Sequence, residues 1–143
     1  MPYPPMMVQP MREELTRLGF RELKTPEEVD RAVAEASEPM LLVVNSVCGC
    51  AAGVARPGVA LSLKNPRAPK TLATVFAGQD IEATARARSY FEGFSPSSPQ
   101  VAILSHRKVL FMLQRHEIEG RTPEQVAQAL TGAYERVSQA ATV

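Results

Sequence analysis

Two cysteines follow directly behind a short apolar segment in the middle of the chain. Met40–Asn45 is too short for a helix and is rich in β-branched residues, so we expect a strand buried on both faces, as in a parallel sheet. The Ala-rich segment 50–63 favours a helix, which Pro57 should bend because proline removes one helical hydrogen bond. Cys48 and Cys50 therefore lie where a buried strand gives way to the start of a helix.

The rest of the chain alternates between strand and helix patterns. Capping boxes, Thr-Pro-Glu-Glu at 25–28 and Thr-Pro-Glu-Gln at 122–125, mark two helix starts. Pro10 suits a first helical turn, Gly19 suits a helix end, and Asp80 suits a helix cap. The expected segments are an N-terminal arm at 1–9, helices at 10–18, 25–37, 81–92 and from 122 onward, and strands at 20–24, 72–77, 101–104 and 109–113, the last two joined as a hairpin.

The order of these elements indicates the fold class. After the first helix it is β-α-β-α-β-α-β-β-α, with parallel crossovers first and a hairpin last, which matches thioredoxin topology. We therefore expect a thioredoxin-like α/β fold with a central mixed sheet and helices on both faces. A chain of 143 residues that is 45% hydrophobic can bury one substantial core, so we expect a single domain over 1–143.

Charge and hydropathy exclude two classes of partner. The formal net charge is +1 and both signs are interleaved, so the chain lacks the basic stripe that nucleic acid binding requires. The longest apolar run, 40–44, falls far short of the roughly 20 residues of a membrane-spanning helix. The N-terminus does not resemble a secretory signal, so we expect a cytoplasmic protein, in which two cysteines serve as reactive thiols or metal ligands.

The position of the cysteines favours redox chemistry. Free N–H groups and the helix dipole stabilise a thiolate at a helix start, and the thiolate is the nucleophile of disulfide exchange. Gly49 leaves the backbone between Cys48 and Cys50 unhindered, so a bulky disulfide can approach. The alternative of a structural disulfide is weak, because a bridge across one intervening residue closes almost no loop.

A soft-metal site is another alternative that these residue types leave open. Zinc usually takes four ligands, and the histidines of this chain have no recognised zinc spacing. Copper(I) can be held by two thiolates, with methionine as an additional ligand. The candidates are Cys48, Cys50, His106 and His116 for zinc, and Met6, Met7 or Met11 beside the thiolates for copper(I). We assign no metal to the site and expect the methionines to dock the first helix.

Three residues outside the cysteine pair are further candidates. Pro99 precedes an expected strand and is either a cis proline or an ordinary trans proline that starts an edge strand. Arg56 lies within two helical turns of the cysteines and either attracts an anionic thiol substrate or is a solvated surface charge. His116 is interpreted as a surface or helix-entry residue rather than a catalytic base.

Several motifs resemble one known family in the same order along nearly the whole chain. They are VVNSVCGCAAG at 43–53 followed by Ala55, Arg56 and Pro57, PMR at 10–12, TVFAGQD at 74–80, SSP at 97–99 and RHEIEG at 115–120. This set is similar to the bacilliredoxin family, with no departure at the cysteines. The resemblance implies a thioredoxin-like fold whose thiols act on mixed disulfides between proteins and bacillithiol, the low-molecular-weight thiol of some bacteria.

The resemblance also implies roles for individual residues. Cys48 would be the thiolate that removes bacillithiol from a client protein, and Cys50 the second thiol, able to close an intramolecular disulfide or to assist release. Pro99 would be the cis-proline beside the active site, and Ser98 would offer backbone hydrogen bonds to the substrate. Bacillithiol is then a co-substrate, no cofactor is tightly bound, and bacillithiolated proteins are the partners. Disulfide isomerisation and a homodimer are left open.

Overall fold

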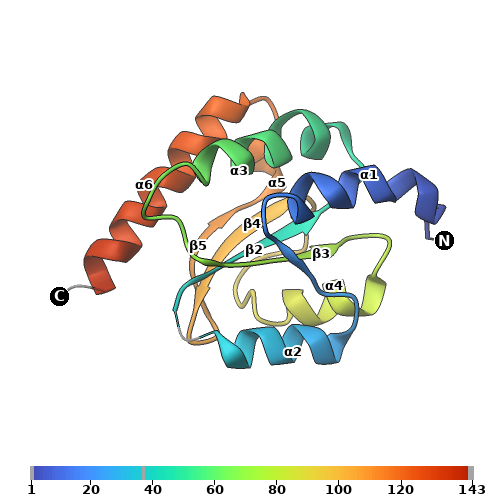
Figure 1. The fold of residues 1–143 in the computed structure, drawn as a ribbon, viewed down its shortest axis with the longest axis horizontal. Helices are drawn as coiled ribbons and strands as arrows, with labels where there is room; N and C mark the ends of the chain where they lie inside the picture. Colours follow the sequence, from blue (N-terminus) through green and yellow to red (C-terminus); the bar gives the residue numbers. More distant parts are fainter. Residues whose placement is uncertain (1, 37, 142–143) are drawn as a thin grey trace.

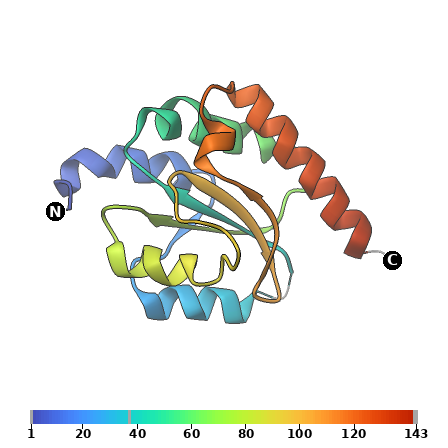
Figure 2. The same cartoon turned by 180° about the vertical axis from the view of Figure 1, so that it is seen from behind.

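Residues 2–36 and 38–141 are described by a computed structural model, which arranges them in two layers of helices around one sheet (Figures 1 and 2). In chain order the elements are α1 (Pro5–Thr16), β1 (Arg21–Glu22), α2 (Pro26–Glu35), β2 (Met40–Asn45), the π-helical turn η1 (Ala51–Ala55), α3 (Arg56–Ser62), β3 (Thr71–Phe76), α4 (Ile81–Arg88), β4 (Gln100–Ser105), β5 (Lys108–Leu113), α5 (Arg115–Ile118) and α6 (Pro123–Ala141).

Within the described residues the sheet has five strands in the order β1-β3-β2-β4-β5. β3 pairs in parallel with β1 and β2, whereas β4 is antiparallel to both β2 and β5. The expected order of strands and helices is confirmed, with the short helix α5 as an addition that the sequence did not indicate. This mixed sheet with helices on both faces is the predicted thioredoxin-like α/β fold.

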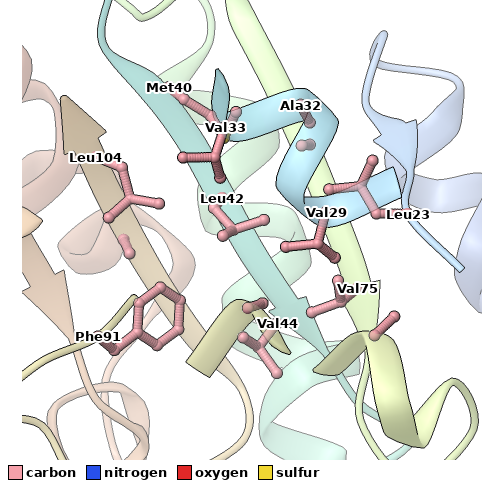
Figure 3. Close-up of a cluster of buried hydrophobic side chains, with 14 of the residues drawn as sticks. Leu23, Val29, Ala32, Val33, Met40, Leu42, Val44, Val75, Phe91 and Leu104 are labelled. Carbon is pink, nitrogen blue, oxygen red and sulfur yellow. The ribbon is translucent and has the colours of Figure 1, made fainter. Parts of the chain in front are cut away.

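Strand β2 forms the centre of two hydrophobic cores. All six of its residues are buried, as predicted for a strand covered on both faces. Because side chains alternate along a strand, Met40, Leu42 and Val44 pack against α2 and α4, as Figure 3 shows, whereas Leu41 and Val43 pack against α1, α3 and α6. One sheet therefore serves both cores, which supports treating the described chain as one domain.

Helix α1 starts earlier than predicted. It begins at Pro5, so most of the expected arm at 1–9 is helical and Pro10 lies inside the helix. Val8, Arg12 and Leu15 are the buried residues of this helix. The prediction that the methionines dock it is wrong for Met6 and Met7, which are 89% and 46% exposed.

Asp80 precedes α4 but does not cap it with its side chain. Its carboxylate instead accepts two hydrogen bonds from Arg12, at 2.8 and 3.2 Å, and Glu22 accepts one from the same guanidinium at 2.6 Å. The guanidinium also lies 5.2 Å from the ring centre of Phe76. Asp80 thus occupies the predicted N-cap position before Ile81, but its side chain does not cap the helix because Arg12 binds its carboxylate.

Pro57 changes the helix that follows the cysteines. The chain makes the π-helical turn η1 before it continues as α3, and Pro57 occupies the first turn of α3. At the junction the N–H of Arg56 bonds to the carbonyl of Ala51, five residues back. The expected irregularity near Pro57 is confirmed, in the form of a π-helical turn where the chain leaves the cysteines.

Helix α3 packs closely on α6, and Gly58 is the point of closest approach. A Cβ atom at Gly58 would lie 2.7 Å from Cγ1 and 2.8 Å from Cβ of Val126. Rotation of Val126 cannot relieve the second contact, because its Cβ is fixed to the backbone of α6. Nearby, the buried hydroxyl groups of Ser62 and Tyr134 are 2.8 Å apart and hydrogen-bonded. A side chain at position 58 would therefore force α3 and α6 to shift apart.

We expect Gly58→Ala to lower the free energy of unfolding by about 1–3 kcal/mol, the usual range for an overpacked core. The matched control is Gly53→Ala in η1, where a Cβ would meet nothing within 4 Å. Urea denaturation of both variants measures the difference. Equal stability of the two alanine variants would show that α3 and α6 are not in this contact.

No helix within residues 2–36 and 38–141 combines the length and the apolar character that crossing a bilayer requires.

Candidate active site

The cysteines lie at one edge of the sheet, where β2 ends at Asn45. The parallel strand β3 ends at the same edge, so the loops after both strands lie on this side. Helical conformation begins at Gly49, directly after Cys48, and the carbonyl of Cys48 accepts hydrogen bonds from the N–H groups of Ala51 and Ala52 at 3.1 and 3.2 Å. Cys48 is therefore the residue that leads into the helix, as the sequence predicted.

Asn45 holds the loop that carries Cys48. Its side-chain oxygen accepts hydrogen bonds from the N–H of Ser46 at 2.9 Å and from Arg56 at 2.8 Å, and its side-chain nitrogen donates to the carbonyl of Met11 at 3.2 Å. The hydroxyl oxygen of Ser46 in turn accepts from the N–H of Cys48 at 3.1 Å. A buried amide at the end of β2 thus fixes the path of the chain into the active site.

Arg56 is part of this support and does not face solvent. Its residue exposure is only 3%, it donates to the carbonyl of Ser46 at 2.8 Å, and its Nε lies 3.1 Å from the Glu14 carboxylate. Both predictions for Arg56, an attractor of anionic substrate and a solvated surface charge, are wrong. The reason is that Glu14 of α1 and Asn45 of β2 enclose the guanidinium behind the cysteine loop.

The two cysteines are free thiols in contact with each other. Their sulfur atoms lie 2.8 Å apart, and both residues are partly exposed. Burial would raise the pKa of Cys48, but hydrogen bonds from the Cys50 thiol, the Ser46 side chain and the N–H groups of Ala51 and Cys50 together lower it below the ordinary thiol value. Cys48 is thus the thiol that loses its proton first.

The same contact has the opposite effect on Cys50. Burial, the hydrogen bond to Cys48 and the negative charge of the Cys48 thiolate raise the pKa of Cys50, and Glu119 adds to this, whereas Arg115 lowers it. Cys48 is therefore the more acidic thiol of the pair, and Cys50 is the one that keeps its proton to higher pH. A thiolate beside a neutral thiol is the arrangement that a nucleophile with a second, resolving thiol requires.

The opposite pKa shifts of the two thiols predict how the reactivity of Cys48 with pH changes when Cys50 is removed. Cys50→Ala removes the strongest hydrogen bond to the Cys48 thiolate, so the pKa of Cys48 should rise. The rate of alkylation by iodoacetamide follows the thiolate fraction, so its midpoint should move to higher pH in the variant. A midpoint that stays unchanged or falls would show that Cys50 does not stabilise the thiolate.

The loop before β4 lies beside the cysteine loop. Val44 pairs with Gln100 in the antiparallel ladder of β2 and β4, so the segment before Gln100 lies at the same end of these strands as the segment that leads from Val44 to Cys48. The bond between Ser98 and Pro99 is cis, and Pro99 is buried. The cis alternative for Pro99 is confirmed, whereas contact of Ser98, Pro99 and Gly49 with substrate stays a prediction.

A buried amide network, which the sequence analysis missed, holds this loop. The side chain of Gln100, which is fully buried, donates to Gln114 Oε1 at 2.7 Å, and the Ser97 hydroxyl donates to the same oxygen at 2.8 Å. Arg88 donates to the carbonyl of Ser97 at 2.6 Å, and burial lowers the pKa of this arginine. Paired glutamines carry no recognisable spacing, so no sequence signal pointed to them.

The potential metal ligands are not assembled into a larger cluster. His106 lies in the turn between β4 and β5, at the opposite end of β4 from Pro99, and His116 is exposed on α5, as its interpretation as a surface residue predicted. Within residues 2–36 and 38–141 there is no group of three or more His, Cys, Asp or Glu side chains that could hold a metal ion. The surface above Gly49 is open, since an added Cβ would meet nothing within 4 Å.

Comparison with known proteins agrees with this site. Residues 3–138 match the model of a family described as disulphide isomerase. A protein named bacilliredoxin from Salinibacter ruber is 52% identical over 137 residues, which cover 94% of this chain and 81% of the relative. Proteins of the same name are 48% identical over 134 residues in Koribacter versatilis, covering 94% of this chain and 92% of the relative, and 52% identical over 129 residues in Bacillus cereus, covering 90% and 89%.

The fold and the thiol pair define a thiol–disulfide oxidoreductase with a thioredoxin-like architecture. Extensive identity over nearly the full length of these relatives shows the family in particular: the chain belongs to the bacilliredoxin family.

Proposed function

We propose that this protein removes bacillithiol from mixed disulfides on client proteins, with Cys48 as the attacking thiolate. The observation that carries the proposal is a partly exposed Cys48 thiol at a helix start, in contact with a second thiol, with a lowered pKa at Cys48 and a raised pKa at Cys50. The name of its relatives, bacilliredoxin, supports bacillithiol as the thiol that is removed. In this proposal bacillithiol is a co-substrate, no cofactor is tightly bound, and the reaction takes place in the cytoplasm.

The chemistry proceeds by two exchanges. The Cys48 thiolate attacks the bacillithiol sulfur of the mixed disulfide, a bond forms between Cys48 and bacillithiol, and the client cysteine leaves as a thiolate. Cys50 then gives up its proton and attacks the sulfur of Cys48, which expels bacillithiol as a thiol and leaves a disulfide between Cys48 and Cys50. An external thiol must reduce that disulfide before the next cycle.

The test is a single turnover with a protein that carries bacillithiol on one cysteine. The reduced wild-type chain is mixed with this protein, and mass spectrometry follows both chains. We expect bacillithiol to leave the client, and this chain to gain either the bacillithiol mass or an internal disulfide. The proposal would be refuted if the client lost bacillithiol no faster with this chain than without it.

Disulfide isomerisation is a second candidate, which the description of the matched family favours. It uses the same first step, attack by Cys48, but on a disulfide between two protein cysteines. Recovery of activity by a scrambled multi-disulfide protein measures it directly. The metal-binding alternative makes a different prediction, since copper(I) or zinc would have to bind the reduced chain more tightly than a free dithiol peptide.

A further inference from the structure

Arg115 is fixed against the loop that borders the cysteines. Its guanidinium Nη1 donates to the carbonyl of Ser98 at 3.3 Å, and its backbone N–H donates to the Ser97 hydroxyl at 3.3 Å. Gln100 pairs with Val44 at the end of β2, from which the chain leads on to Cys48, so these contacts with the segment before Gln100 place Arg115 at the rim of the active site. The side chain is 46% exposed, so a substrate can reach it.

Glu119 orients the same guanidinium but leaves part of it available. The carboxylate of Glu119, one helical turn further along, accepts from Nε of Arg115. Nη2 has no hydrogen-bond partner among residues 2–36 and 38–141. The guanidinium is thus held by two contacts, and one of its nitrogens is left for an acceptor from outside the chain.

The charge of Arg115 interacts electrostatically with both sulfur atoms. The hydrogen bond to Glu119 and the negative charges of Cys50 and Cys48 raise the pKa of Arg115. Conversely, Arg115 lowers the pKa of Cys50. These mutual effects agree with the hydrogen bonds of Arg115 to Ser97 and Ser98 in placing the guanidinium near the reacting sulfurs, which is the position that the sequence had suggested for Arg56.

We propose that Arg115 determines substrate specificity by binding a carboxylate of the low-molecular-weight thiol while Cys48 takes this thiol from its disulfide. The inference rests on the proposed function and adds the chemical class of the thiol, which is anionic. A guanidinium suits this task because it binds carboxylates through paired N–H donors. In this division of roles Arg115 recognises the thiol, and Cys48 carries out the exchange.

The proposal can be tested with three disulfide reagents, each of which joins thiopyridine to a small aliphatic thiol. The aliphatic thiol is mercaptopropionate, which is anionic, mercaptoethanol, which is neutral, or cysteamine, which is cationic. The Cys48 thiolate attacks the aliphatic sulfur, a bond forms between Cys48 and the aliphatic thiol, and thiopyridine leaves with the electron pair and is measured by its absorbance. The readout is the rate with each charged reagent divided by the rate with the neutral one. This ratio cancels any change in the thiolate fraction of Cys48.

We expect Arg115→Gln to lower the anionic-to-neutral ratio about fivefold and to raise the cationic-to-neutral ratio, and Arg115→Lys to restore much of both. Glu119→Gln removes a competing negative charge but keeps an acceptor for Nε, so it should raise the anionic-to-neutral ratio. The control is Arg17→Gln at the C-cap of α1, where Arg17 is likewise exposed and paired with a glutamate four residues away, Glu13. It should leave both ratios unchanged.

Two results would overturn the inference, and they differ from each other. If Arg115→Gln changes the rates with all three reagents by the same factor, Arg115 acts on the cysteines and not on the thiol, and the specificity role is wrong while the proposed function stands. If the wild-type chain reacts with none of the three although iodoacetamide alkylates Cys48, the proposed function fails and this inference fails with it.

Discussion

Cys48→Ser should abolish the release of bacillithiol from a client protein, with a rate at least about a thousandfold below that of the wild type. The hydrogen bonds that lower the pKa of Cys48 act on its sulfur, and a serine hydroxyl in their place stays protonated near neutral pH. The fold should not change, because residue 48 is partly exposed and outside both cores. Release is measured with the mixed-disulfide client and mass spectrometry.

Cys50→Ala is the matched variant for this prediction. It should still accept bacillithiol onto Cys48 but should stop there, because the thiol that expels it is missing. If Cys48→Ser kept full activity while Cys50→Ala lost the first transfer, the roles of the two cysteines would be reversed.

Arg12→Met should lower the free energy of unfolding by about 3 kcal/mol, the lower end of the range for breaking a buried ion pair from one side. The side chain of Arg12 is 9% exposed, and its loss leaves the carboxylates of Glu22 and Asp80, 21% and 15% exposed, without their shared cation. Because these groups join α1, β1 and the start of α4, the loss should loosen α1 from the sheet. Thermal and urea denaturation measure the effect.

The control for Arg12 is Arg17→Met at the C-cap of the same helix. Arg17 forms an exposed pair with Glu13, with side chains 72% and 41% exposed, and such pairs contribute little to stability. We expect a change below about 0.5 kcal/mol. Equal effects of Arg12→Met and Arg17→Met would argue against the buried cluster.

Local sequence patterns predicted most of the fold, because the relevant interactions lie within a few residues. The side chain of Thr25 caps α2 by accepting from the N–H of Glu28 at 3.1 Å, and Thr122 and Gln125 exchange the bonds of a capping box at 2.9 and 3.1 Å. The six-residue apolar run of β2 likewise identified a strand covered on both faces. Patterns of this kind are independent of the rest of the chain.

Errors arose where distant residues decide the outcome. Asp80 has the chemistry of a helix cap, but Arg12 binds its carboxylate, and Arg56 has the chemistry of a surface cation, but Glu14 and Asn45 enclose it. The helix predicted over residues 81–92 is also too long, since α4 ends at Arg88. Long-range pairing of charges leaves no local pattern in a single sequence.

For the candidate site, the sequence located the chemistry but not its surroundings. The cysteine pair and the cis bond before Pro99 were anticipated, from the strand-to-helix junction and from the family resemblance. In the sequence Arg115 is only one residue of the motif at 115–120, and its position at the rim follows from its hydrogen bond to Ser98 in the structure. The fold brings these residues together through the register of β2 and β4, which no single segment encodes.

The most direct test of the account is the mass of the Cys50→Ala chain after reaction with a bacillithiolated protein, followed by peptide mapping. We predict one bacillithiol, bound to Cys48, because Cys48 carries out the first exchange and the thiol that would expel bacillithiol is missing. A chain that remains unmodified under conditions in which the client loses its bacillithiol to the wild type would contradict the account.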